Sequence, residues 1–129
     1  MIKGLDGVLI SSENPRALSD FYKDKVGLEF ADEMEYGEKG EAAFMLKIGA
    51  VNLAILPHSD IKGLNLTPAR IMLNIEVDDE EAEVKKLKDA GVKCVAEIYH
   101  VEGYGYVATF EDVDGNYFQL VSPWDGGKN

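Results

Sequence analysis

The sequence predicts an α+β fold in which two βαβββ modules form a curved mixed sheet around a cavity. The first observation is an internal repeat, since the order strand, helix and three strands occurs twice within 129 residues. The second is spacing, because Gly7 and Met72 lie 65 residues apart, as do Ala54 and Gln119. The third is size, because one such module could not bury both faces of its own sheet. An α+β sandwich without a cavity would use the same elements.

The two modules are predicted to form one domain. They cover residues of about 4–56 and 70–123 and are joined by the linker 57–69. The linker is short and polar, which does not suit a spacer between independent domains. One compact domain built of two similar halves follows.

The first module begins with an apolar strand predicted over residues 5–10. Asn14 followed by Pro15 predicts a helix start, because Asn is a good N-cap and Pro suits the first turn. The helix should end at Gly27. Its predicted buried stripe has three- and four-residue spacing and consists of Leu18, Phe21, Tyr22 and Val26. Three strands should follow over residues 28–34, 42–48 and 51–56.

The second module repeats that order, with a strand predicted over residues 71–77. Its helix should begin at the acidic pair Asp78 and Asp79 and end at Gly91. The predicted buried stripe of this helix consists of Val84, Leu87 and Ala90. Strands over 92–98, 106–111 and 117–122 complete the module.

Charge and cysteine content exclude several classes of function. The chain has 13 basic and 24 acidic residues, a formal charge of −11. Nucleic acids and anionic membranes are therefore not expected as partners, whereas a cationic ligand is favoured. The single cysteine, Cys94, cannot form an internal disulfide. No secretory segment or membrane span is recognisable, so the sequence predicts a cytoplasmic protein.

Short motifs in a fixed order carry a resemblance to a known family. The matching segments are Phe21-Tyr22, Val26-Gly27-Leu28-Glu29, Val77-Asp78-Asp79, Ala90-Gly91-Val92 and Phe110-Glu111-Asp112-Val113-Asp114-Gly115-Asn116. Together they resemble the vicinal oxygen chelate superfamily, which includes glyoxalases, extradiol dioxygenases and bleomycin-resistance proteins. The resemblance covers roughly residues 5–123.

The resemblance implies paired βαβββ modules, often a homodimer, and in the enzymes a divalent metal held by His, Glu or Gln. Alignment on the flanking motifs places the four ligand positions at Gly7, Ala54, Met72 and Gln119. Glycine and alanine lack donor atoms, and a methionine thioether is a soft ligand that suits Mg, Mn, Zn and Ni poorly. Only Gln119 is compatible, so no metal and no other cofactor is expected.

Other residues offer little chemistry in place of a metal. His58 and His100 have no recognisable ligand spacing and are interpreted as solvent-facing loop residues. Glu76 is a weak candidate for a general base if it is buried. A charged strand residue is the simpler interpretation of Glu76.

Strand alternation predicts the inward wall of the cavity. The inward positions are Leu5, Gly7, Leu9, Asn52, Ala54, Leu56, Met72, Asn74, Glu76, Tyr117, Gln119 and Val121. This wall is apolar with a few amides and one acid, which suits recognition of an organic molecule by shape. The same residues could equally fill a core.

Aromatic residues add to the predicted binding site. Tyr99, Tyr104, Tyr106 and Trp124 lie in or beside segments that, by the resemblance, border the cavity mouth. Flat or cationic ligands could stack there, although ordinary packing is also consistent with these residues. The predicted ligand-binding set is Gly7, Leu9, Asn52, Ala54, Met72, Asn74, Tyr104, Tyr106, Gln119 and Trp124.

Two functions compete at this point. The favoured one is a metal-free protein resembling the bleomycin-resistance group, which sequesters a bulky organic ligand, cationic by preference, in a groove of a homodimer. The alternative is a glyoxalase- or dioxygenase-like enzyme, a lyase, isomerase or ring-cleaving oxygenase. Loss of three of four ligand positions removes the Lewis acid on which those enzymes depend, which favours the binder.

Overall fold

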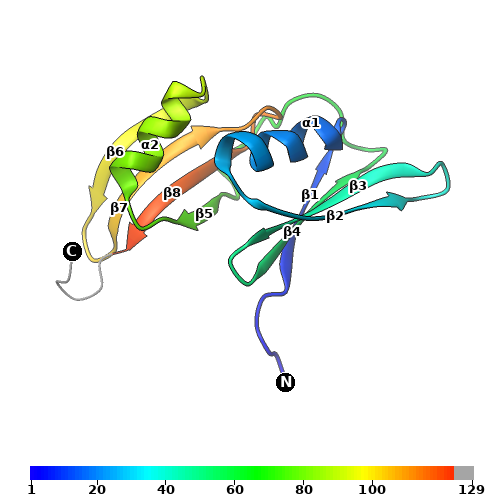
Figure 1. Cartoon of the computed structure of the whole chain (residues 1–129), viewed down its shortest axis with the longest axis horizontal. Helices are drawn as coiled ribbons and strands as arrows, with labels where there is room; N and C mark the ends of the chain where they lie inside the picture. The colour runs from blue at the N-terminus through cyan, green and yellow to red at the C-terminus, as the bar shows by residue number, and fades with distance from the viewer. Residues whose placement is uncertain (124–129) are drawn as a thin grey trace. The chain divides into compact units, whose positions relative to one another are not determined.

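The chain divides into two compact units, shown in a computed structural model that describes residues 1–123. Unit 1 comprises Met1–Gly63 and unit 2 comprises Leu64–Asn129, so their boundary lies inside the predicted linker. Figure 1 shows helix and strands in the same order in each unit. The single domain over 4–56 and 70–123 remains a prediction.

Unit 1 is a four-stranded mixed sheet with one helical segment. Its elements are β1 (Gly7–Ser12), α1 (Pro15–Asp20), the π-helix η1 (Phe21–Val26), β2 (Glu29–Tyr36), β3 (Glu41–Ile48) and β4 (Val51–Pro57). The strand order is β1-β4-β3-β2, with β1 parallel to β4 and the other pairs antiparallel. Both β1 and β2 are therefore edge strands.

Unit 2 repeats this topology. Its elements are β5 (Leu73–Glu76), α2 (Glu80–Asp89), β6 (Lys93–Val101), β7 (Gly105–Glu111) and β8 (Tyr117–Pro123). The strand order β5-β8-β7-β6 matches that of unit 1 position by position. Leu9 pairs with Ala54 and Asn74 pairs with Gln119, so the 65-residue spacing also holds in the strand register. The α+β fold of two βαβββ modules is confirmed, with its strands in two mixed sheets.

The first helix begins as predicted but changes type along its length. Asn14 is the N-cap, and its side chain accepts a hydrogen bond from the Ala17 amide at 3.2 Å. One regular helix to Gly27 was expected, yet the last six residues are π-helical. The Gly27 and Leu28 amides both donate to the Tyr22 carbonyl, at 3.0 and 2.9 Å, which closes the wide turn. Gly27 allows this because its φ of 90° favours glycine.

The second helix is regular. Asp79 is its N-cap and accepts from the Ala82 amide at 3.1 Å. Val84 and Leu87 are buried as predicted, but Ala90 is exposed, because the helix ends at Asp89. The buried residue one turn before Val84 is Glu80, which the predicted stripe did not include.

Several strand ends differ from the prediction. The first strand begins at Gly7 rather than Leu5, because its pairing with β4 begins at Gly7 and Asn52. β5 is shorter than the predicted 71–77, and Met72 precedes it. β6 continues to Val101 beyond the predicted end at residue 98, so His100 lies on a strand and not in a loop.

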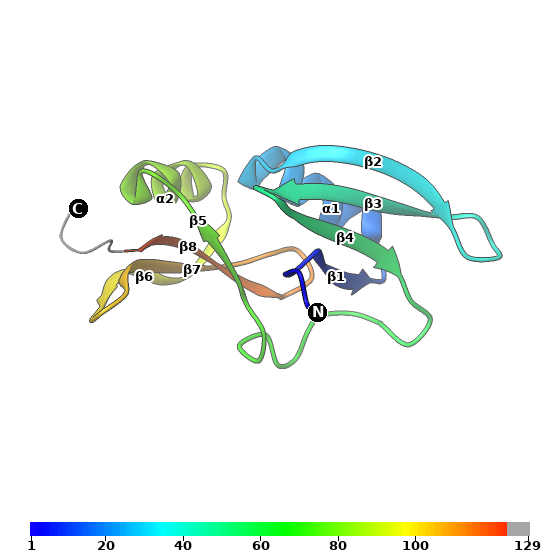
Figure 2. The ribbon, with the colours of Figure 1, turned by 90° about the horizontal axis from the view of Figure 1, so that it is seen from below.

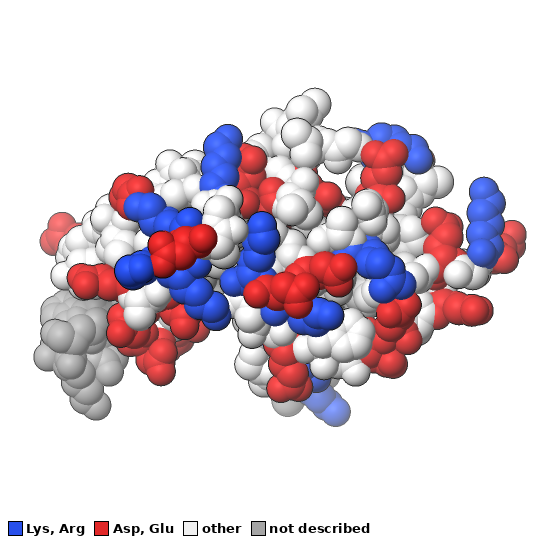
Figure 3. Space-filling view, turned by 45° about the horizontal axis from the view of Figure 1, so that its top comes forward, with Lys and Arg blue, Asp and Glu red and all other residues white. Residues whose placement is uncertain are grey.

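The surface charge is mixed on the face that Figure 3 presents, where acidic and basic side chains are interspersed. The ion pairs of the structure include Lys88 with Glu97 at 2.7 Å and Lys85 with Asp89 at 2.6 Å. Among residues 1–123, no helix is long and apolar enough to cross a membrane.

Candidate functional site

The sheet of unit 1 has one face covered by a helix and one that is not. Leu46, Leu53 and Ile55 are fully buried on the covered face, and α1 lies behind these strands in Figure 2. Paired residues of neighbouring strands point to the same side of a sheet, and side chains alternate along each strand. The opposite face is here called the open face of unit 1. By this rule it carries Gly7, Leu9, Ser11, Glu29, Asp32, Met34, Tyr36, Glu41, Ala43, Met45, Lys47, Asn52, Ala54 and Leu56.

Apolar side chains form the centre of the open face of unit 1. Leu9 pairs with Ala54, and Ala54 pairs with Met45, so these three lie in one row across three strands. A hollow of about 190 Å³ lies here, lined by Asp6, Gly7, Val8, Leu9, Met45, Asn52 and Ala54. Leu9 is 59% exposed and Tyr36 is 48% exposed, although the Leu9 side chain and the Tyr36 ring are large and apolar. Exposed apolar surface of this kind is typical of binding sites.

Four predicted ligand-binding residues are brought together in this hollow, namely Gly7, Leu9, Asn52 and Ala54. Leu5, predicted on the same wall, precedes β1 and is exposed. Sequence reasoning missed Met34, Tyr36 and Met45, which extend the face across β2 and β3. Alternation along those strands could have identified them, but β2 contains a register shift between Phe30 and Asp32 that interrupts its period.

The corresponding face of unit 2 is polar at its centre. Asn74 pairs with Gln119, and Gln119 pairs with Thr109. Gln119 is only 8% exposed, and its Nε2 donates to the Thr109 hydroxyl at 3.1 Å. Asn74 and Glu76, on the edge strand β5, are exposed. The amide predicted as a ligand contact therefore already has a partner inside unit 2.

The remaining predicted residues of unit 2 lie apart from Gln119. Side chains alternate along β7, so Tyr106 projects from the face of the sheet opposite to that of Thr109 and Gln119. The centroid of its ring lies 5.1 Å from the centroid of the His100 ring. Tyr104 lies in the turn between β6 and β7 and is half-buried. Trp124 falls outside the described residues.

The residues at the four family ligand positions do not fit a divalent metal. A Cβ atom added at Gly7 would lie 2.6 Å from the Asn52 carbonyl oxygen, so a histidine there would require the paired strands to move. Ala54 has no donor atom, and the soft Met72 thioether suits such ions poorly. Among residues 1–123, no group of three or more His, Cys, Asp or Glu side chains could hold a metal ion.

Glu80, and not the weak candidate Glu76, is a buried carboxylate of unit 2. Glu76 is exposed on β5, so the burial required for a general base is not met. Glu80 is 8% exposed, and neither of its oxygens has a hydrogen-bond partner. Burial raises the pKa of Glu80 from 4.5 to about 7. Helical spacing could have indicated its position, since residues 80, 84 and 87 share one face of α2.

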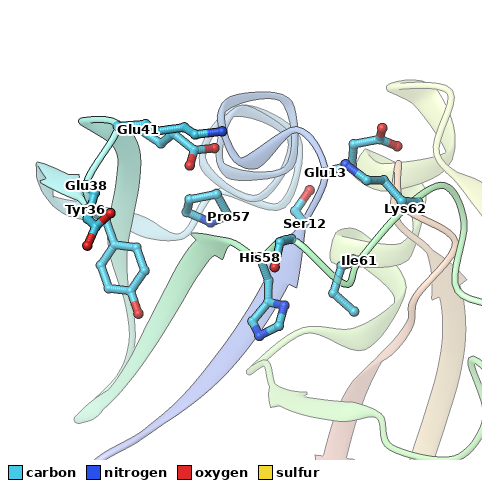
Figure 4. Close-up of a pocket in the computed structure, with 12 residues that line it drawn as sticks. Ser12, Glu13, Tyr36, Glu38, Glu41, Pro57, His58, Ile61 and Lys62 are labelled. Atoms are coloured by element: carbon cyan, nitrogen blue, oxygen red, sulfur yellow. The ribbon is translucent and has the colours of Figure 1, made fainter.

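A larger hollow lies where the strands of unit 1 end, and sequence reasoning did not predict it. This strand-end hollow has a volume of about 580 Å³. It is lined by Ser12, Glu13, Tyr36, Gly37, Glu38, Lys39, Glu41, Pro57, His58, Ser59, Ile61 and Lys62. Figure 4 shows the rings of Tyr36 and His58 directed to the same side. Tyr36 belongs both to this hollow and to the open face of unit 1.

Comparison with known proteins gives the family. The profile of the Glyoxalase/Bleomycin resistance protein/Dioxygenase superfamily matches residues 4–120. The protein YetH of Bacillus subtilis (strain 168) is 30% identical over 121 residues, which are 93% of this chain and 98% of YetH. The chain belongs to this superfamily, and the resemblance inferred from its motifs is confirmed.

Solved structures share the fold at lower identity. The antibiotic binding protein TnmS3 from Streptomyces sp. CB03234 has a TM-score of 0.76 and 21% identity, covering 95% of this chain and 98% of that one. A mutant of the fosfomycin resistance protein FosX from Listeria monocytogenes, complexed with Mn(II), has a TM-score of 0.70 and 18% identity, covering 96% and 93%. At these identities the likeness shows the fold alone.

Proposed function

We propose that this member of the superfamily is a metal-independent binding protein that holds a bulky organic ligand on the open face of unit 1. The observation that carries the proposal is an apolar row of exposed Leu9 with half-buried Ala54 and Met45, extended by exposed Met34 and Tyr36. Such a face recognises a ligand by shape and by loss of apolar surface from water. The net charge of −11 favours a cationic ligand over an anionic one.

The metal-independent part of the proposal rests on donor chemistry. Two of the four family ligand positions carry no donor atom, one carries a soft thioether, and the amide of Gln119 is hydrogen-bonded to Thr109. The alternative of a glyoxalase- or dioxygenase-like enzyme gains no comparable support, because Glu76 is exposed. TnmS3 is an antibiotic binding protein of the same fold, which supports a binding role.

A homodimer and a cytoplasmic location belong to the proposal as well. In a dimer, a partner would cover part of the open face of unit 1 and deepen the shallow hollow of about 190 Å³ into a groove. Light scattering at several concentrations would test the dimer. If the protein is a monomer and still binds ligand, the dimer groove is excluded and the open face of unit 1 alone is the proposed site.

The decisive experiment measures ligand binding to a variant that fills the hollow. A panel of bulky cationic antibiotics, bleomycin included, is screened by thermal shift and tyrosine fluorescence. Ala54→Phe should weaken the affinity of each bound compound at least tenfold, because the ring occupies the central row. Ala17→Phe is the matched control, since Ala17 is exposed on α1, which covers the other face.

Three results would count against the proposal. Failure of every compound in the panel to bind would weaken the binding role. Equal affinity for the wild-type protein and Ala54→Phe would place the site elsewhere. Stoichiometric metal in protein purified without chelator, with stabilisation by that ion, would overturn the metal-independent part.

A further inference from the structure

The strand-end hollow is formed by segments of unit 1 that are distant in sequence. Ser12 ends β1, Tyr36 ends β2, and Pro57 ends β4, while the turn after β4 supplies His58 and Ile61. In Figure 4, Pro57 and Ser12 lie above the rings of Tyr36 and His58 in the view. At about 580 Å³ the hollow is large enough for a group of several rings.

A backbone contact sets the hydrogen-bonding character of His58. Its Nδ1 accepts a hydrogen bond from the Asp60 amide at 3.1 Å. In the neutral ring the proton must then be on Nε2, so that atom is a hydrogen-bond donor. The His58 carbonyl also accepts from the Ile61 amide at 3.1 Å, which fixes the turn that carries the ring. The hollow therefore offers a donor at a defined place.

The charges around the hollow disfavour an anionic ligand. Glu13, Glu38 and Glu41 line it together with Lys39 and Lys62, which leaves a formal excess of one negative charge. Glu13 is held by the Gly63 amide, which donates to its Oε1 at 2.9 Å. In the described part of the chain, none of the three carboxylates takes part in an ion pair. They remain able to accept hydrogen bonds from a ligand or to attract its positive charge.

Tyr36 connects the hollow to the proposed binding face. Its side chain lies on the same sheet face as Met34 and Met45, at the end of the strand where the hollow begins. A ligand whose apolar body lies on the open face could therefore extend past Tyr36 without crossing the sheet. The ring of Tyr36 offers that extension a flat surface for stacking.

We propose that the strand-end hollow binds a flat aromatic group, uncharged or cationic, between Tyr36 and Pro57. A hydrogen-bond acceptor of that group would accept from Nε2 of His58. This inference rests on the proposed function. The aromatic group, with its acceptor atom, would be one end of the ligand whose apolar body is held on the open face of unit 1. The ligand class is therefore an extended aromatic molecule with an acceptor oxygen or nitrogen at one end.

The test compares three small two-ring probes. They are 7-methoxycoumarin, which has a carbonyl acceptor, 2-methoxynaphthalene, which lacks it, and coumarin-3-carboxylate, which is anionic. Binding affinity is measured by isothermal titration calorimetry, which serves the histidine variants as well, and the ¹⁵N spectrum of labelled histidines reports the tautomer of His58 in the wild-type protein. We expect 7-methoxycoumarin to bind about fivefold more tightly than 2-methoxynaphthalene, the value of one hydrogen bond, and more tightly than coumarin-3-carboxylate.

Variants locate the interaction. His58→Phe should weaken 7-methoxycoumarin about fivefold and leave 2-methoxynaphthalene unchanged, because only the donor is lost. His100→Phe is the matched control, since His100 is the other histidine, is exposed, and lies on β6 of unit 2. Tyr36→Leu should weaken both neutral probes, whereas Tyr99→Leu, on the corresponding edge strand of unit 2, should weaken neither.

The possible results separate this inference from the proposed function. If His58→Phe has no effect while Ala54→Phe still weakens binding of the antibiotics at least tenfold, the strand-end hollow is excluded and the open face stands. Equal affinity of the two neutral probes would also overturn the role of His58. If His58→Phe weakens 7-methoxycoumarin while Ala54→Phe leaves antibiotic binding unchanged, the hollow binds alone and the proposed face is wrong. No binding by any probe would overturn the inference.

Discussion

In unit 1 the row Leu9, Ala54 and Met45 is apolar and open, whereas the row Asn74, Gln119 and Thr109 of unit 2 is polar and largely buried. The strands that carry the two rows have the same order and the same pairing. The difference therefore comes from the side chains and not from the backbone. One repeated scaffold therefore carries an exposed apolar surface in unit 1 and a buried, hydrogen-bonded amide at the equivalent place in unit 2.

The largest difference between the two units is expected when a side chain is added at Gly7. Gly7→Ala should lower the free energy of unfolding by about 1–3 kcal/mol, because its Cβ would meet the Asn52 carbonyl at 2.6 Å and force β1 from β4. Met72→Ala, at the equivalent position of unit 2, should cost less. Urea unfolding followed by circular dichroism measures both. Gly7→Ala as stable as wild type would show that β1 can move freely.

Gly7→His restores a family ligand residue and carries the same Cβ atom. We expect it to be at least as destabilising as Gly7→Ala, and the triple variant Gly7→His, Ala54→Glu, Met72→His to gain no tight metal site. Elemental analysis and thermal shift with divalent ions check this. Stoichiometric, stabilising metal in the triple variant would contradict the steric argument.

Glu80 distinguishes the helices of the two units, because α1 has no acidic residue in its first turn. Burial raises its pKa to about 7 in the folded protein, from an ordinary 4.5. As pH rises, the unfolded chain therefore loses this proton at a lower pH than the folded protein does. The contribution of Glu80 to the stability of the folded protein is complete below about pH 4.5 and is lost between about pH 4.5 and 7.

Glu80→Gln should remove that pH dependence and stabilise the protein by about 1–2 kcal/mol at pH 8, where the wild type buries an unpaired charge. Thermal unfolding between pH 4 and 8 measures the effect. Glu81→Gln is the matched control, because Glu81 is the next residue and is exposed. A wild-type curve that is flat between pH 4.5 and 7 would refute the elevated pKa.

The polar row of unit 2 can be tested through its hydrogen bond. Thr109→Val keeps the shape of the side chain but leaves the buried Nε2 of Gln119 without its acceptor, which should cost about 1–2 kcal/mol. Thr109→Ser retains the hydroxyl and should keep the bond. The difference between the two variants in chemical unfolding is the measurement, and equal stability would show that the bond contributes little.

Periodicity and caps were sufficient to predict the fold. Asn14 with Pro15 and Asp79 each begin a helix where expected, and the repeat of 65 residues recurs in the register of the paired strands. These features are local or depend on one sequence offset. The change to a π-helix after Asp20 was not predicted, because the apolar stripe of Leu18, Phe21, Tyr22 and Val26 has the spacing of a regular helix.

The candidate site was predicted less completely. Alternation along β1 and β4 brought Gly7, Leu9, Asn52 and Ala54 together, since both strands are regular. The strand-end hollow was missed because Ser12, Tyr36 and His58 are brought together only by the ends of three strands. No period in the sequence marks the point at which separate strands end side by side.

The smallest expected effects come from the two N-caps and test whether the units unfold together. Asn14→Ala and Asp79→Ala each remove one acceptor of a backbone amide, and each should cost about 1 kcal/mol. Asn14→Ser and Asp79→Asn are the controls, because both retain a capping oxygen. If the modules form the predicted single domain, both substitutions shift one common thermal transition, and their losses add in the double variant. Two transitions, of which Asn14→Ala moves only one, would show that the repeated halves are separate folding units.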